Sequence, residues 1–144
     1  MFGLFKKKQV HTFSDTHRNA IARAASLLQL QLATCKSLSA YPRLIRTDFA
    51  RGYIYGFFDG AIQASEAPDV SETDLVLLSI VGHGIVFGGD PALAESYVAE
   101  SLQRQGTDGF DAGQSCGGTE FFDFVQGKIG QTNTLEHFLH KASQ

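Results

Sequence analysis

Apolar residues recur at three- and four-residue intervals along most of the chain, which is the spacing of one face of an α-helix. The clearest case begins at Ser14, a residue type that caps helix starts, and runs to about Leu38, before Tyr41 and Pro42. Because no second strand-like run is present, the sequence predicts an all-α fold, a compact bundle of five or six helices. Further helices are expected over 47–65, over 71–87, from 90 to just before 106, from 118 or 119 to about 127, and over 132–139.

The segment 75–87 is almost wholly apolar, with a histidine between two glycines, Gly82 and Gly84, as its main interruption. It is too short to cross a bilayer as a helix. The acidic residues Glu72 and Asp74 directly before it suit the positive end of a helix dipole. The pattern therefore predicts a buried helix near the centre of the bundle.

Three glycines, Gly52, Gly56 and Gly60, fall every four residues and form a bare stripe along the helix expected over 47–65. Glycine weakens a helix by roughly 0.5–1 kcal/mol relative to alanine, so a stripe of glycines indicates a second backbone close to that face. That backbone can belong to the same chain or to a second copy in a homodimer, and a bound ligand is a third interpretation. Gly52, Gly56 and Gly60 are accordingly candidate interface residues.

The segment 106–118 holds five glycines, two aspartates and Cys116. This composition predicts an irregular Gly-rich loop before the last helical hairpin, and a loop of this length is a common place for function. Cys116 would then precede a helix N-terminus, where the helix dipole lowers a thiol pKa, which makes it a weak candidate nucleophile. If the loop folds against His83, then His83, Asp111 and Cys116 form a candidate ligand-binding site.

His83 interrupts an apolar helix, so it is expected to be buried, with Tyr55 or Asp59 as its hydrogen-bond partner. His137 and His140 are three residues apart on the last helix and are weak candidate metal ligands. A zinc site needs one or two further ligands, and no spacing in the sequence indicates them. No cofactor is expected.

Residues 1–13 are predicted to form a tail ahead of a single helical domain over 14–144. Phe2 and Phe5 are candidate interface residues that dock on the domain or on a partner. The lysines that follow, Lys6–Lys8, are compatible with weak contact to a membrane surface, and stable membrane insertion is not expected.

The chain has 144 residues, 43% of them hydrophobic and 19% charged, with a formal net charge of −3. This balance gives no electrostatic support for nucleic-acid binding. The basic side chains of Arg43, Arg46 and Arg51 are expected to lie in solvent, on a connector and at the start of a helix. Two cysteines are too few for a disulfide framework, and no signal peptide is apparent, so a cytoplasmic location is expected.

These patterns do not indicate a group of residues that could act together as a catalytic site. The function expected first is a small non-catalytic interaction or regulatory module that associates with itself as a homodimer or with another protein. The alternative is a small-molecule or metal-binding domain, possibly an enzyme, with its site in the segment 106–118.

Overall fold

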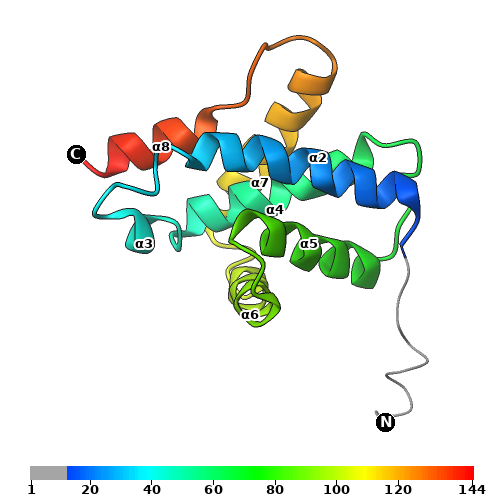
Figure 1. The fold of residues 1–144 in the computed structure, drawn as a ribbon, viewed down its shortest axis with the longest axis horizontal. Helices are drawn as coiled ribbons and strands as arrows, with labels where there is room; N and C mark the ends of the chain where they lie inside the picture. Colours follow the sequence, from blue (N-terminus) through cyan, green and yellow to red (C-terminus); the bar gives the residue numbers. More distant parts are fainter. Residues whose placement is uncertain (1–12) are drawn as a thin grey trace.

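The computed structural model describes residues 13–144, and this part of the chain folds into helices with no strand. The all-α prediction is therefore confirmed. Six of the helices have nine or more residues, and α3 is a single short turn of four. The helices, shown in Figure 1, are α2 (Asp15–Leu32), α3 (Tyr41–Leu44), α4 (Asp48–Gln63), α5 (Glu72–Val86), α6 (Pro91–Leu102), α7 (Asp108–Val125) and α8 (Thr134–Ala142).

Side-chain caps define where most of these helices begin. Ser14, Thr47 and Ser71 each accept a hydrogen bond from the backbone N–H three residues later, and Asp90 accepts from two N–H groups. Such caps satisfy donors that have no partner within the helix, and each stabilises its helix by about 1 kcal/mol. The first helix is shorter than predicted, because the chain leaves α2 after Leu32 and continues in turns.

Helix α4 lies at the centre of the molecule, where nearly all of its residues are buried. Helices α2 and α5 pack against each other and against α4, and α7 makes the most extensive contact with α4 of any helix pair (Figure 1). Helix α6 packs against α5 and α4 and is seen end-on in Figure 1. The core is formed mainly by aromatic and aliphatic side chains of α2 and α4, with Tyr53, Phe57 and Phe58 among its largest members.

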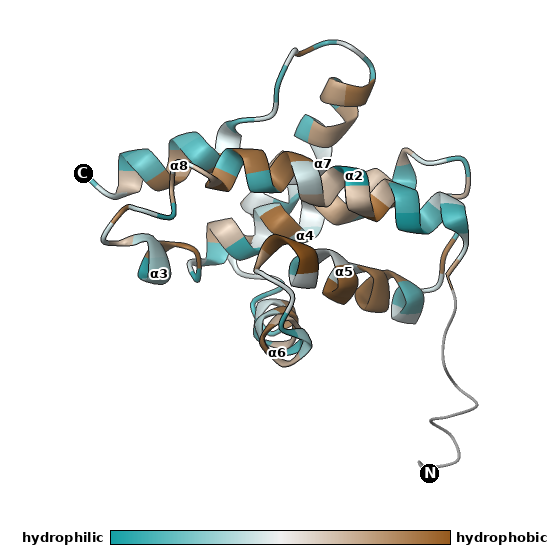
Figure 2. Ribbon diagram, viewed as in Figure 1, coloured by the Kyte–Doolittle hydropathy of each residue, from teal (hydrophilic) through white to brown (hydrophobic). Residues whose placement is uncertain are grey.

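Helix α5 is not the central helix, which corrects the prediction for residues 75–87. One side of it, including Leu78, Gly82 and Val86, is buried against α2, α4 and α6. The opposite side is in contact with solvent although it is just as apolar, and Figure 2 shows most of α5 in the brown of hydrophobic residues. Length and apolar content alone do not distinguish a fully buried helix from one that is buried on a single side.

The prediction of an irregular Gly-rich loop over 106–118 is wrong, because most of this segment is helical. Thr107 caps the start of α7 by accepting a hydrogen bond from the Phe110 N–H, and α7 then runs without a break to Val125. Asp108 and Asp111 lie in its first turn, where a helix dipole favours acidic residues. Only Gly106, with φ 91°, and Thr107 remain outside the helix.

Two glycine stripes explain why α7 is helical despite its composition. A Cβ atom on Gly56 would lie 2.1 Å from the Gln114 carbonyl oxygen of α7, and one on Gly113 would lie 2.2 Å from the Phe49 carbonyl oxygen of α4. Only glycine allows the two backbones to come this close. The close packing of the two helices offsets the low helix propensity of the glycines between them, which are Gly52, Gly56, Gly60, Gly113, Gly117 and Gly118.

A buried carboxylate joins the end of this pair to α8. Glu120 of α7 accepts hydrogen bonds from the Tyr53 hydroxyl of α4, from the backbone N–H groups of Asn133 and Thr134, and from the Thr134 hydroxyl. Gln31 of α2 donates to the same Tyr53 hydroxyl at 2.9 Å. Glu120 therefore takes the place of a side-chain cap for α8, since Asn133 makes none.

We expect Glu120→Gln to lower the free energy of unfolding by about 1–2 kcal/mol, because the amide replaces one accepting oxygen with a donor that faces other donors. Urea denaturation of the full chain measures this change. Glu95→Gln on the exposed side of α6 is the matched control and should change stability by less than about 0.5 kcal/mol. Equal effects of the two substitutions would show that Glu120 does not hold α8.

Candidate functional site

A row of exposed apolar side chains on α5 is the most unusual surface feature of the described residues. Leu77, Val81 and Ile85 are 38%, 47% and 40% exposed, and they follow each other at four-residue intervals. This spacing places them on one side of the helix over a length of about 12 Å. We call these three residues the α5 stripe. Large apolar side chains gathered on one surface are typical of protein interaction sites.

No charged residue interrupts the α5 stripe. From Leu75 to Gly89 the chain carries no acidic or basic side chain other than His83, which is fully buried. Besides being apolar, the stripe borders a groove of about 370 Å³ between the start of α5 and the end of α6. Leu77 lies at this groove together with Val76 and Leu102. The surface therefore combines protruding side chains with a neighbouring hollow.

The sequence analysis missed the α5 stripe because it assigned the whole of 75–87 to the interior. A signal was present in the small residue Gly82. A Cβ atom there would lie 2.4 Å from the Phe58 ring of α4, so Gly82 marks the side of α5 that faces the core. Leu77, five residues before Gly82 and therefore about 140° around the helix from it, is one of the exposed residues.

His83 is buried, as predicted, but its partner differs from the prediction. Its Nδ1 lies 2.7 Å from the Ser79 carbonyl oxygen one turn earlier, and neither Tyr55 nor Asp59 bonds to it. Because a carbonyl only accepts, Nδ1 carries the proton, and the buried Nε2 has no hydrogen-bond partner. Burial lowers the pKa of His83 to about 4, and the positive charge of Arg51 acts in the same direction. The ring is neutral at physiological pH.

Cys116 lies in the middle of α7 rather than before a helix N-terminus, because the predicted loop is helical. It therefore lacks the N-terminal helix dipole that was expected to activate it. Burial raises the pKa of the Cys116 thiol, and the nearby Glu120 carboxylate raises it further. These surroundings disfavour the thiolate that a nucleophilic cysteine needs.

The predicted ligand-binding set is not brought together. His83 packs among the rings of Phe58, Phe87 and Tyr97, with the Phe58 and His83 ring centroids 5.3 Å apart. Asp111 accepts a hydrogen bond from the Gly106 N–H at the start of α7. Cys116 follows Asp111 by five residues, which places the two side chains on different sides of α7.

The two weak metal-ligand candidates occupy the surface of α8. His137 is exposed, and His140 contacts the Thr34 hydroxyl at 3.2 Å through Nε2. Within residues 13–144, no group of three or more His, Cys, Asp or Glu side chains is arranged to hold a metal ion.

The glycine stripe is not an interface between chains. Gly52, Gly56 and Gly60 are covered by α7 of the same chain, so the intramolecular interpretation is the correct one. The other two candidate interface residues, Phe2 and Phe5, lie outside the described residues. Among the helices that the structure describes, none is long and apolar enough to cross a membrane.

Comparison with known proteins gives no match: no protein-family model, no curated protein and no solved structure is significantly similar to this chain.

Proposed function

We propose that this protein is a small, non-catalytic interaction module that associates with a second copy of itself through the α5 stripe. The observation that carries the proposal is the exposure of Leu77, Val81 and Ile85, which follow the acidic first turn of α5 and have no charged side chain among them. Covering these side chains removes apolar surface from water, which is favourable by roughly 25 cal/mol for each Å² covered. A net charge of only −3 gives little repulsion between copies.

The α5 stripe of one copy can pack against the α5 stripe of a second copy that is related to it by a two-fold axis. In an antiparallel pair of α5 helices with the axis beside Val81, Leu77 of each chain lies opposite Ile85 of the other. Ile85 would then approach the groove that Leu77, Val76 and Leu102 border. Antiparallel helices also place opposite ends of their dipoles side by side, which adds a small favourable contribution.

The test is the oligomeric state of the full chain with Val81→Glu at the centre of the stripe. The wild-type protein should pass from monomer to dimer as its concentration rises from low micromolar to submillimolar, as measured by sedimentation velocity. Val81→Glu should stay monomeric at every concentration, because a dimer would bury two like charges against apolar surface. Glutamate is a better helix former than valine, so the exposed substitution leaves α5 intact.

Leu30→Glu is the matched control. Leu30 is 71% exposed on α2, away from the stripe, and the same charge is introduced there. This variant should dimerise like the wild-type protein. A wild-type chain that remains monomeric throughout, or two variants with the same behaviour, would contradict association through α5.

A further inference from the structure

A second hollow lies between α3 and α6 and has no role in the association proposed above. Its volume is about 610 Å³, within the range of pockets that bind small molecules. It is bounded by α3 and the residues after it, by Phe87 at the end of α5, and by one side of α6. Its apolar lining comes from three segments of the chain and consists of Tyr41, Pro42, Ile45, Phe87, Leu93 and Tyr97.

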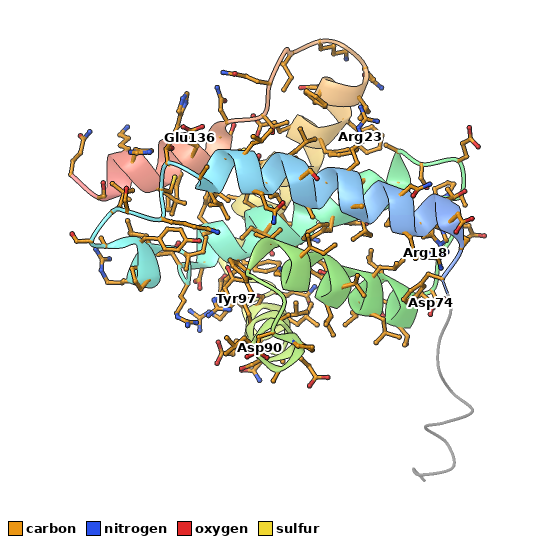
Figure 3. All side chains as sticks on the ribbon, in the orientation of Figure 1. Arg18, Arg23, Asp74, Asp90, Tyr97 and Glu136 are labelled. Atoms are coloured by element: carbon orange, nitrogen blue, oxygen red, sulfur yellow. The ribbon has the colours of Figure 1, made fainter. Side chains whose placement is uncertain are left out.

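One wall of the hollow is an aromatic pair held in place from behind. The Tyr97 hydroxyl donates to the Ile45 carbonyl oxygen at 2.6 Å, and the Phe87 and Tyr97 ring centroids are 4.9 Å apart. Figure 3 shows Tyr97, from the middle of α6, beside the C-terminal end of α5. These contacts fix the Tyr97 ring, which is only 6% exposed, and the half-buried Phe87 ring offers the more accessible surface of this wall.

A buried arginine supports Tyr97 on its other side. The Arg51 guanidinium lies 4.4 Å from the centre of the Tyr97 ring and donates to the Tyr97 carbonyl oxygen and the Ser101 hydroxyl. The sequence analysis expected Arg51 to be solvated, but it is only 6% exposed. Its ion-pair partner is Glu100, 3.1 Å away on the rim of the hollow.

The charged side chains that line the hollow are Arg46 and Glu100. Glu100 is already paired with Arg51, whereas the exposed side chain of Arg46, which also lines the hollow, has no ion pair among the described residues. Because the charge of Glu100 is balanced by Arg51, which lies behind the lining, the charge of Arg46 is the one that lacks an ion-pair partner at the hollow. A guanidinium binds a carboxylate with two parallel hydrogen bonds, so Arg46 suits a carboxylate group.

Tyr41 adds a donor without an acceptor. Its ring lines the hollow, and its hydroxyl is buried with no hydrogen-bond partner. Burial raises the pKa of Tyr41 to about 12, so the hydroxyl keeps its proton at physiological pH.

From these features we infer that the hollow binds a small aromatic carboxylate. Its ring would lie against Tyr97 and Phe87, with Leu93 on the solvent side. Its carboxylate would pair with Arg46 at the rim. This site is distinct from the segment 106–118, which is part of α7 and lines no portion of this hollow.

The absence of tryptophan from the chain makes a direct test simple. Indole-3-acetate is an aromatic carboxylate whose fluorescence can be excited beyond the tyrosine absorption. Its anisotropy should rise and saturate as the full chain is added. Tryptamine has the same ring with an ammonium in place of the carboxylate, and it should bind at least about tenfold more weakly, which corresponds to about 1.4 kcal/mol.

Two pairs of variants locate the site. Arg46→Gln should weaken binding of indole-3-acetate about tenfold, whereas Arg43→Gln, an exposed arginine of α3 outside the hollow, should leave it unchanged. Ser96→Phe should fill the hollow and abolish binding, whereas Ala99→Phe, on the exposed side of α6, should not. Circular dichroism confirms that each variant is folded.

Three results would overturn the inference: no saturable binding of indole-3-acetate, equal affinities for the carboxylate and the ammonium, or equal effects of Arg46→Gln and Arg43→Gln. Each of them is separate from the proposed dimer. The fluorescence titration is performed on Val81→Glu as well as on the wild-type chain, and both should give the same affinity.

Discussion

Gly56→Ala is expected to destabilise the protein by about 3 kcal/mol or more, although alanine is the better helix former. The added Cβ would lie 2.1 Å from the Gln114 carbonyl oxygen and 2.8 Å from the Gln114 Cα. Backbone atoms cannot rotate away as a side chain can, so α4 and α7 must move apart. Separation would loosen the packing along the whole helix pair, which is the most extensive in the molecule. Urea denaturation followed by circular dichroism measures the loss.

Gly84→Ala is the matched control for this prediction. Gly84 is also inside a helix, but the nearest atom to an added Cβ is the Ala94 Cβ at 3.8 Å, an ordinary contact. Here the gain in helix propensity should prevail and stabilise the protein by up to about 1 kcal/mol. If Gly56→Ala were also stabilising, the close approach of α4 and α7 would be refuted.

The two glycine-rich segments show what the sequence pattern could and could not predict. The regular four-residue spacing of Gly52, Gly56 and Gly60 indicated a close backbone contact, and the structure has one. The partner segment was predicted as a loop because its glycines were treated individually as helix breakers. Gly113 and Gly117 are in fact also four residues apart, and each faces an α4 carbonyl oxygen. Helix propensity is a weak preference that tertiary contact overrides.

Apart from the start of α7, helix starts were easier to predict than the environment of each helix. Ser14 and Asp90 act as caps, as their positions before apolar periodic segments indicated. A cap is a local interaction between residues two or three positions apart, so it is visible in the sequence. Which side of the apolar helix α5 faces water depends on where α2, α4 and α6 pack, and this is not a local property.

The same distinction applies to the candidate sites. Burial of His83 could be predicted from its apolar neighbours, but the expected cluster with Asp111 and Cys116 required a loop that does not exist. The hollow between α3 and α6 was missed because its lining is drawn from segments around residues 41, 87 and 97. Residues that line a cavity together share no spacing along the chain, so no periodicity reveals them.

His83 should make the stability of the protein depend on pH between about 6.5 and 4. The folded chain binds a proton at His83 with a pKa of about 4, because burial disfavours the charged ring, whereas the unfolded chain binds it near the ordinary value of 6.5. Protonation below pH 6.5 therefore favours the unfolded chain. The stability contributed by neutral His83 is present above this pH and is lost progressively down to about pH 4.

The expected loss between pH 7 and pH 4.5 is about 2–3 kcal/mol, at 1.36 kcal/mol for each unit of difference in pKa. His83→Leu removes the titrating group, so urea denaturation of this variant should lose about that much less stability than the wild-type chain over the same interval. Carboxylates titrate in this range too: Arg104 lowers the pKa of Asp48 through a hydrogen bond, which adds to the loss at the acidic end. Because both chains share Asp48, the difference between them isolates His83. Parallel curves for the two chains would show that the unpartnered Nε2 takes up a proton without loss of stability, and that the pocket of Phe58, Phe87 and Tyr97 rings around it admits water.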